Sequence, residues 1–380
     1  MKKNQLVTLG KHIDILSGCA FPSSGFNRNN GVPLIRIRDI LSGKTETYYE
    51  GSYDLKYLIK KGDLLVGMDG DFNREYWKGT DALLNQRVCK ITPNPETLDK
   101  NFLYHFLQKE LDKIHATTDV VTVKHLSVKK IQDIKIRLPS LKEQKRIAAI
   151  LDKADAIRQK REQAIKLADD FLRAKFLEMF GTPANNIHRF PKGTIRDLVD
   201  SVNYGTSAKA PIDSGEYPIL RMGNITYQGR WDFTDLKYLD LSVKEKDKYL
   251  VKEGDLLFNR TNSKELVGKT AVYEEDRPMA FAGYLIRVRP NSIGNNYYIS
   301  GYLNSIHGKI TLMNMCKSIV GMANINAQEL QNIEILIPPK HLQDEYEIIY
   351  KKIKKGLSIY DKSAMQLQLL ASNLSNKYFM

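Results

Sequence analysis

The feature that most limits how this 380-residue sequence can fold is an internal repeat. Three short motifs in one half return in the same order in the other half. They are Pro33–Ile37 and Pro218–Met222, Lys61–Leu65 and Glu253–Leu257, and Ile134–Pro139 and Ile333–Pro338, at offsets of 185, 192 and 199 residues. Offsets that drift along the chain indicate two copies of one unit whose loops have diverged. The sequence therefore predicts two related domains.

Each copy has two parts with different patterns. Residues 1–138 and 186–337 contain short β-branched and aromatic runs separated by Gly, Asn, Asp and Pro, which is typical of a mostly β domain with some helix. Residues 139–181 and 338–380 follow these domains and have the pattern of long helices. The predicted fold class is therefore α+β, with two mostly β domains in tandem and a long helix after each.

Both helical segments carry a narrow apolar stripe with alternating spacings of three and four residues, broken in the first by Arg161. The stripes are Ile147, Ile150, Ala154, Ile157, Ala164, Ala168 and Phe171, and Leu342, Tyr346, Ile349, Ile353, Leu357, Tyr360, Ala364, Leu367, Ala371 and Leu374. No Pro or Gly interrupts residues 142–180, and Gly181 and Pro183 then end the pattern. The first helix can thus reach about 38 residues, or roughly 57 Å.

Two such helices can bury their stripes against each other, whereas a single one leaves its stripe in water. Because a whole domain lies between them in sequence, we expect the two helices to run antiparallel as a coiled coil. Two alternatives remain at this point: each helix packs on its own domain, or the helices pair with those of another molecule.

The composition favours a polyanionic partner. Lys and Arg number 58 against 44 Asp and Glu, giving a formal net charge of +14, which suits nucleic acid or a membrane surface. No apolar run approaches the roughly 18 residues of a membrane span, so we expect a cytoplasmic protein without a membrane partner. Cys19, Cys89 and Cys316 are far apart and form no CxxC pair, so reduced core cysteines are expected rather than disulfides or zinc.

Several segments resemble the specificity (S) subunits of Type I restriction-modification enzymes, and the resemblance covers essentially the whole chain. The most specific is Leu138–Gln163, where a Leu-Pro step leads to Glu-Gln-x-Arg-Ile and a long helix. Val66–Asn73 resembles a recognition-domain loop of the family, and Asn259–Arg260 with Val267–Ala271 resembles the other common form. Gln343–Tyr346 departs from the Glu-Gln-x-Arg-Ile pattern, so the two helix starts need not contact partners identically.

The resemblance implies a subunit that recognises a bipartite double-stranded DNA sequence and scaffolds methyltransferase (M) subunits, two being expected, and restriction (R) subunits. It implies no cofactor, no metal and no catalysis of its own. The sequence contains no Walker-type loop, GxGxxG after a strand, HExxH, or Asn-Pro-Pro or Asp-Pro-Pro motif. Two other classes remain open: a fused restriction or methyltransferase enzyme, and a coiled-coil protein that binds another acidic partner.

Readout of DNA needs cations near phosphates and forked or amide side chains at base edges. The first copy offers such residues at Arg36, Arg38, Asn73, Arg74, Lys78, Gln86, Arg87, Lys124 and His125. The second offers Arg221, Asn224, Arg260, Asn262, Lys264, Lys269 and Asn324. Arg36 and Arg221 occupy matched positions, where an intradomain salt bridge is an equally good interpretation. Arg74 and Arg260 are expected in polar loops after the Gly-Asp-Leu-Leu strands.

Other notable residues favour structural roles. Asp69 and Asp71 flank Gly70, but they have no third ligand at motif spacing and indicate a turn before a metal site. Phe72, Tyr76 and Trp77 could stack on bases, although core packing is the stronger expectation. His125 is expected to be a structural histidine, and no residue is predicted to be catalytic. The recognised base sequence cannot be read from these loops.

Overall fold

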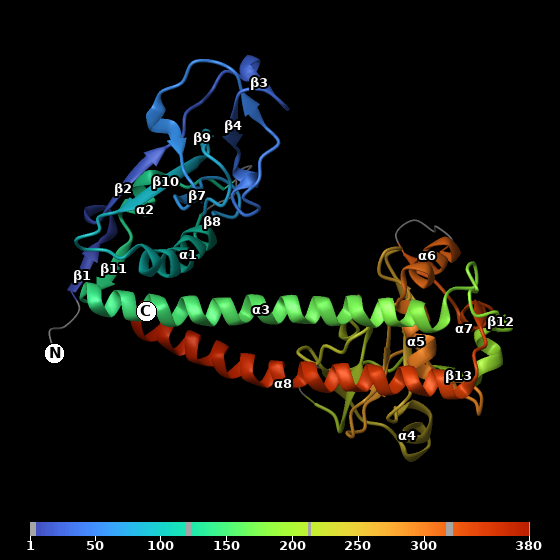
Figure 1. Cartoon of the computed structure of the whole chain (residues 1–380). Coiled ribbons are helices and arrows are strands. Elements are labelled where there is room, and N and C mark those ends of the chain that lie inside the picture. Colours follow the sequence, from blue (N-terminus) through green and yellow to red (C-terminus); the bar gives the residue numbers. More distant parts are fainter. Residues whose placement is uncertain (1–4, 119–123, 212–213, 317–321, 380) are drawn as a thin grey trace. The chain divides into compact units, whose positions relative to one another are not determined.

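The computed structural model describes residues 5–118, 124–211, 214–316 and 322–379. The chain divides into two compact units. The first comprises Met1–Arg161 and Lys362–Met380, and the second comprises Glu162–Asp361. Two 40-residue helices, α3 (Leu141–Phe180) and α8 (Lys340–Phe379), each contribute to both units (Figure 1).

The first unit is built on short strands. Its four-stranded antiparallel sheet has the order β2 (Ile13–Ser17), β10 (Val88–Pro93), β7 (Leu64–Gly67), β8 (Arg74–Tyr76). A five-stranded sheet has the order β3 (Phe26–Asn27), β5 (Tyr48–Tyr49), β4 (Val32–Ile35), β9 (Ala82–Leu84), β6 (Leu58–Ile59), with β4 and β9 parallel. β1 (Gln5–Thr8) pairs with β11 (Lys135–Leu138), and the helices are α1 (Lys100–Ala116) and α2 (Val128–Gln132).

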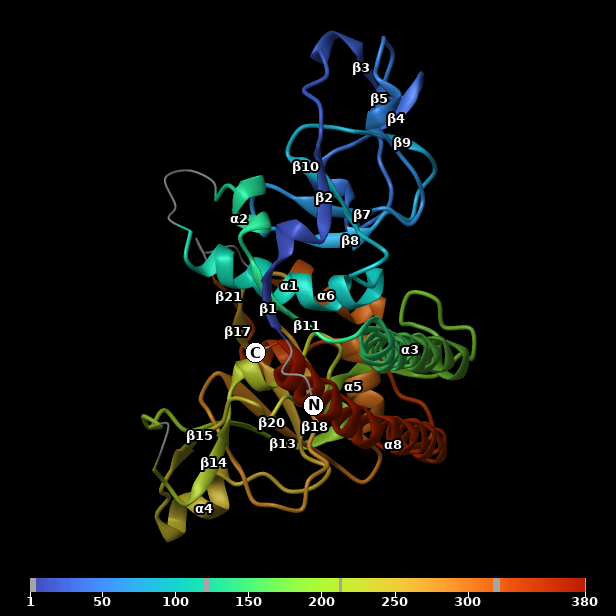
Figure 2. The ribbon, with the colours of Figure 1, turned by 90° about the vertical axis from the view of Figure 1, so that its left-hand side faces the viewer.

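The second unit repeats this plan. Its four-stranded sheet has the order β13 (Val199–Tyr204), β20 (Leu285–Pro290), β16 (Leu256–Asn259), β18 (Thr270–Val272). A three-stranded sheet has the order β15 (Lys237–Leu239), β14 (Tyr217–Leu220), β19 (Ala280–Phe281). Two further sheets have two strands each: β12 (Lys192–Thr194) pairs with β22 (Glu334–Leu336), and β17 (Thr261–Asn262) pairs with β21 (Ala323–Asn324). Its helices are α4 (Val243–Tyr249), α5 (Asn296–Asn304), α6 (Ile306–Met315) and α7 (Ala327–Gln331). In Figure 2, β14, β15 and α4 lie at one edge of this unit.

The repeated motifs lie on matched strands. The Pro-containing motifs form β4 and β14, and each is followed by a short 3₁₀ helix, Ile37–Asp39 or Met222–Asn224. The Gly-Asp-Leu-Leu motifs turn into β7 and β16, because Gly62 and Gly254 adopt φ angles of 89° and 87° that other residues rarely take. The third motif forms β11 and β22, the strands that close the two copies. The predicted duplication is therefore confirmed.

The two long helices are antiparallel. In the first unit, the start of α3 and the end of α8 share one core, in which Ile147 and Leu151 pack with Phe379. In the second unit, the end of α3 and the start of α8 meet, because Phe176 and Phe180 contact the ring of Tyr346. Each helix thus packs on both β-rich parts and on its partner helix, and the predicted antiparallel coiled coil is confirmed (Figure 1).

One stripe residue was assigned to the wrong face. Phe171 is 49% exposed, and the buried face of α3 continues instead through Phe176, which is 1% exposed. The remaining stripe positions are buried or half-buried where they are described; the side chains of Tyr360 and Ala364 lie outside the described part. Cys89 and Cys316 are buried free cysteines as expected, and Cys19 is a half-buried one.

The glutamine five residues after each closing proline has a structural explanation. The Gln144 side chain is buried; its Nε2 donates to the carbonyl oxygens of Thr97 and Pro139, and its Oε1 accepts from the Asp99 amide. The Gln343 Nε2 likewise donates to the carbonyl oxygens of Ile293 and Pro338. Buried amides of this kind require such partners. The two glutamines therefore fix the first turn of each long helix to the β-rich part that precedes it.

Candidate nucleic-acid interface

Three segments meet at one end of the four-stranded sheet in the first unit. The residues after β7 bond to the turn before β10, where the Met68 amide donates to the Arg87 carbonyl oxygen at 2.8 Å. They also bond to residues 124–126, where the Leu126 amide donates to the Met68 carbonyl oxygen at 2.7 Å and Asp69 bridges His125. We define the first loop face as the side chains that these segments bring together: Asp69, Gln86, Arg87, Lys124 and His125.

The second unit builds the same arrangement at the same end of its sheet. The Arg260 amide donates to the Tyr284 carbonyl oxygen at 3.0 Å, and the Ile325 amide donates to the Arg260 carbonyl oxygen at 2.9 Å. Strands β17 and β21 pair Thr261 with Asn324, as Asp69 pairs with His125 in the first unit. We define the second loop face as Tyr204, Arg260, Thr261, Tyr284 and Asn324.

The first loop face is charged. The Asp69 carboxylate lies 3.0 Å from Nη1 of Arg87 and 2.6 Å from Nδ1 of His125. The side chains of Arg87 and His125 are 56% and 55% exposed, whereas that of Asp69 is 22% exposed. Lys124 is half-buried and its Nζ donates to the His115 carbonyl oxygen at 2.6 Å. The exposed part of this face therefore presents donors held in place by one carboxylate.

The second loop face carries two tyrosines, an arginine, a threonine and one amide side chain. Tyr204 and Tyr284 are 41% and 55% exposed, and the guanidinium of Arg260 lies 4.9 Å from the centre of the Tyr204 ring. The Thr261 hydroxyl donates to Oδ1 of the exposed Asn324 at 3.0 Å. Stacked arginine and aromatic rings suit contacts with nucleic-acid bases. The two units therefore present different chemistry on one backbone arrangement.

Three other predicted residues of the first copy, Arg36, Arg38 and Lys78, lie away from this face. Arg36 and Arg38 are exposed at the 3₁₀ turn after β4, where the Asp39 carboxylate accepts the Arg36 amide and lies 3.8 Å from Nε of Arg38. Lys78 is exposed and pairs with Glu75 at 3.3 Å. Gln86 is exposed beside Arg87.

The expectation that Arg74 lies in a loop was wrong. Arg74 begins β8, and its guanidinium stacks 3.4 Å from the centre of the Tyr104 ring on α1. Asn73 is half-buried, and its carbonyl oxygen accepts the Gly67 amide at 2.8 Å. By strand register, the counterpart of Arg74 in the second unit is Thr270, not Arg260. Arg260 follows β16 directly and belongs to the second loop face.

In the second copy, three predicted residues are held by contacts within their own unit. Arg221 forms the intradomain salt bridge that the sequence left open, with Asp235 at 2.8 Å. Asn224 is 3% exposed, and its amide donates to the carbonyl oxygens of Asp232 and Asp235. Lys269 is 8% exposed and donates to the Met222 carbonyl oxygen, and burial lowers the pKa of its amine. Asn224 and Lys269, offered by the sequence as candidates for DNA contact, are therefore buried within the fold.

The remaining predictions are placed as follows. Lys264 is exposed, and Asn262 is half-buried with its Oδ1 accepting the Ser263 amide at 2.9 Å. Phe72 and Trp77 are buried at 0% and 2% exposure, which confirms core packing, and Tyr76 is half-buried. His125 is held by Asp69, as a structural histidine would be, although more than half of its side chain is exposed.

Sequence reasoning missed Tyr204, Thr261 and Tyr284, and it did not recognise Asp69 as the carboxylate that fixes Arg87 and His125. One signal was present, because His125 and Asn324 differ by 199 positions, the same offset as the closing motif. The pairing of these residues with Asp69 and Thr261 depends on strand register, which the linear sequence does not show.

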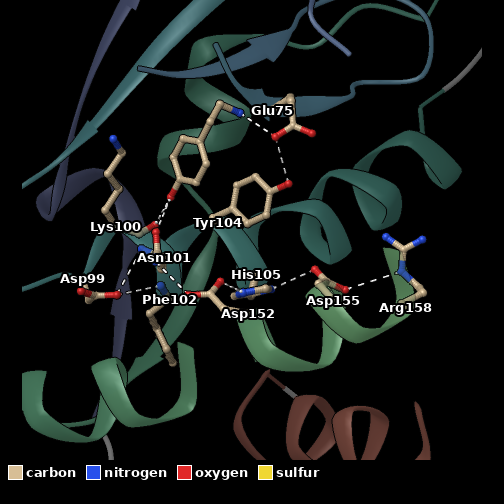
Figure 3. A network of polar contacts seen from close by, with 11 residues as sticks. Glu75, Asp99, Lys100, Asn101, Phe102, Tyr104, His105, Asp152, Asp155 and Arg158 are labelled. Atoms are coloured by element: carbon tan, nitrogen blue, oxygen red, sulfur yellow. Dashed lines mark hydrogen bonds and ion pairs between the residues drawn. The ribbon is translucent and has the colours of Figure 1, made fainter. Parts of the chain in front are cut away.

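A polar network joins α1 to α3 within the first unit (Figure 3). The Tyr76 hydroxyl donates to Oδ1 of Asn101, whose Nδ2 donates to Asp152 on α3 at 2.9 Å. Nε2 of His105 lies 2.7 Å from the Asp152 carboxylate, and the His105 side chain is 8% exposed. Burial raises the pKa of the Tyr76 phenol above its ordinary value.

Neither a metal site nor a membrane span is found in what the structure describes. Among residues 5–118, 124–211, 214–316 and 322–379, no three His, Cys, Asp or Glu side chains gather as ligands for one ion. None of the helices in these same ranges is both long and apolar enough to cross a membrane.

Comparisons with known proteins agree with this fold. The family model of the Type I restriction modification DNA specificity domain matches residues 1–167 and 190–371, once for each copy. The EcoBI specificity subunit of Escherichia coli is 30% identical over 403 aligned positions, covering 97% of this chain and 82% of that protein. The EcoKI specificity subunit of Escherichia coli strain K12 is 24% identical, covering 92% of this chain and 80% of that protein. The chain therefore belongs to the Type I restriction-modification DNA specificity family.

Solved structures show the same fold. The S subunit of a Type I restriction-modification system from M. genitalium superposes over 100% of this chain and 97% of its own, with a TM-score of 0.66 at 15% identity. A chain from a study of complex assembly and conformational transition of the Type I R-M system superposes over 100% of this chain and 98% of its own, with a TM-score of 0.51 at 17% identity.

Proposed function

We propose that this chain recognises a bipartite DNA sequence, with one half-site read by each copy, and scaffolds the subunits that act on the DNA. The first domain (residues 1–138) and the second domain (residues 186–337) are the two readers. The observation that carries the proposal is the pair of loop faces, which share a backbone arrangement but differ in side chains. Two readers with different chemistry suit a target whose halves differ.

The charge of the chain supports DNA as the ligand. A net charge of +14 favours binding to a phosphate backbone, and such binding weakens steeply with salt. The exposed cations Arg36 and Lys264 lie outside the loop faces and are proposed as phosphate contacts. Contacts of this kind set the position of the protein on the duplex and carry no sequence information.

Catalysis is proposed to come from partner subunits. The chain alone is expected to show no methyl transfer, ATP hydrolysis or DNA cleavage, and to direct sequence-specific methylation when mixed with methyltransferase subunits, with two per chain expected. The test is reconstitution with purified subunits on duplex DNA, followed by mapping of the methylated bases. Turnover by the pure chain would favour the fused-enzyme alternative, and failure to shift duplex DNA at low salt would favour the interaction protein.

We also propose that the length of the α3 and α8 pair sets the distance between the half-sites. Lengthening both helices by one heptad preserves the seam and adds about 10.5 Å, or roughly 3 base pairs of DNA. Each added base pair also turns the groove by roughly 35°, so about 100° must be absorbed by linker or DNA twist. Methylation is expected to be lost at the original spacing, with both half-sites retained at an altered one. A folded, assembled variant that modified only the original spacing would contradict this role.

A further inference from the structure

Matched backbone positions of the two loop faces carry different side chains. The amide-to-carbonyl bonds that define each face align Asp69 with Thr261, Arg87 with Tyr284, and His125 with Asn324. In both faces a polar side chain after the central strand orients the residue opposite it: Asp69 bonds His125, and Thr261 bonds Asn324. Two readers of different base sequences require a shared backbone arrangement that carries different side chains.

Arg87 is fixed for contact with a base edge. Its backbone φ angle is 73°, a conformation that is uncommon outside glycine, and its main chain is bonded to Met68. The ion pair with Asp69 uses Nη1, which leaves the Nε and Nη2 donors of a 56% exposed guanidinium for a ligand. A carboxylate beside the guanidinium disfavours a phosphate, because like charges repel, and therefore favours a neutral base. Two parallel donors match the O6 and N7 acceptors of guanine.

Asn324 is oriented in a similar way. Its side chain is exposed, and the Thr261 hydroxyl donates to its Oδ1, which fixes the plane of the amide. An amide with its Nδ2 donor and a second lone pair on Oδ1 matches the N7 acceptor and N6 donor of adenine.

We propose that Arg87 and Asn324 are specificity-determining residues, with Arg87 reading a guanine in the half-site of the first domain and Asn324 reading an adenine in that of the second. Asp69 and Thr261 are positioning residues that hold these two side chains and their neighbours. This inference rests on the proposed function, because it requires DNA to bind at the loop faces.

The test uses the full chain assembled with its methyltransferase subunits. Duplex DNA libraries carry the mapped target with one base pair randomised at a time, and sequencing of methylated molecules gives the base preference at each position. In Arg87→Gln, the preference for guanine at one pair of the first half-site is expected to fall roughly 5- to 150-fold, the range for loss of one bidentate contact. In Asn324→Ala, an equal fall is expected for adenine at one pair of the second half-site.

Matched controls separate readout from charge and folding. Arg137→Gln removes the same charge from an exposed site on β11, and Asn332→Ala removes an exposed amide after α7; both should retain the wild-type preferences. Arg87→Lys keeps the charge but loses the fork, so it should also lose guanine preference while retaining salt-dependent binding to non-target DNA. Thermal unfolding of each variant checks that the fold is retained.

The outcomes separate this inference from the function on which it rests. A change at one base pair of the expected half-site, with the other half-site unchanged, supports the assignment. A uniform loss of methylation across the library, or an unchanged preference in Arg87→Lys, would overturn it while leaving the proposed function standing. A wild-type complex that methylated the library without sequence preference would overturn the proposed function itself.

Discussion

The counterpart helices α1 and α5 contact α3 through different chemistry at one matched position. Asp99 and Asn295 cap the two helices in the same way, which aligns His105 on α1 with Gly301 on α5. His105 bonds Asp152 of α3, whereas the absence of a side chain at Gly301 admits the ring of Phe176, also from α3. At this position the duplicated frame therefore supports a polar attachment to α3 in the first unit and an aromatic attachment to α3 in the second.

The aromatic attachment is buried and closely packed. Phe176 and Phe180 of α3 lie 5.6 and 4.7 Å from the Tyr298 ring of α5, measured between ring centres, and Tyr346 of α8 contacts both phenylalanines. Burial raises the pKa of the Tyr298 phenol, whose hydroxyl donates to the Leu336 carbonyl oxygen. Packing of this kind is intolerant of volume changes, whereas hydrogen bonds depend on the loss or retention of partners.

The largest effect is expected from removing a ring of the aromatic attachment. Phe180→Ala should lower the free energy of unfolding of the second unit by about 3–5 kcal/mol, because Phe180 is 0% exposed and its removal leaves a cavity. The measurement is denaturant unfolding followed separately for each unit by site-specific probes. Phe171→Ala, on the same helix but 49% exposed, is the matched control and should change little. Equal effects of the two variants would refute the assignment of the buried face.

A smaller effect is expected at the polar attachment. His105→Ala removes one partner of Asp152 and should destabilise the first unit by about 1–3 kcal/mol, because a partly buried hydrogen bond to a carboxylate is lost. The exposed His188→Ala, in the second unit, serves as the control. Amide exchange along α1 is expected to rise in His105→Ala and to stay unchanged in the control. Unaltered exchange along α1 would show that the network does not hold this helix.

The smallest effects are expected from alanine substitutions at two glycines, which should change stability in opposite directions. A Cβ at Gly301 would lie 2.6 Å from the Phe176 ring, so Gly301→Ala should destabilise the second unit by about 1–2 kcal/mol despite the better helix propensity of alanine. Gly356 in α8 is exposed, with nothing within 4 Å of such a Cβ, so Gly356→Ala should stabilise the chain by about 0.5–1 kcal/mol. Thermal unfolding of the pair tests both signs, and a stabilising Gly301→Ala would contradict close packing at that site.

Patterns local in sequence predicted most of the fold. The repeat, the matched strands and both long helices follow from motif order, period and the positions of Pro and Gly. Phe171 was assigned to the buried face in error. An apolar stripe of spacing three and four rotates slowly around a long α-helix, because its period differs from 3.6 residues, and the last turns of α3 therefore bury Phe176 instead.

The candidate site was predicted less well, because its geometry depends on contacts between distant residues. Asn224 and Lys269 are of types that read DNA, but a turn and a β-rich core enclose them. Arg221 meets Asp235 across a loop, and Asp69 meets His125 across 56 positions. Arg87 and Asn324 were identified by residue type alone, whereas their orienting partners Asp69 and Thr261 required the strand register.

The central claim is that the two copies read DNA independently, and domain exchange tests it most directly. Residues 1–138 are replaced by the equivalent domain of a relative with a different target, and the methylated sites of a host carrying the chimera and its methyltransferase are mapped. The account predicts that one half-site changes, while the other half-site and the spacing between them stay as in the wild type. A chimera that folds and assembles but changes both half-sites would contradict it.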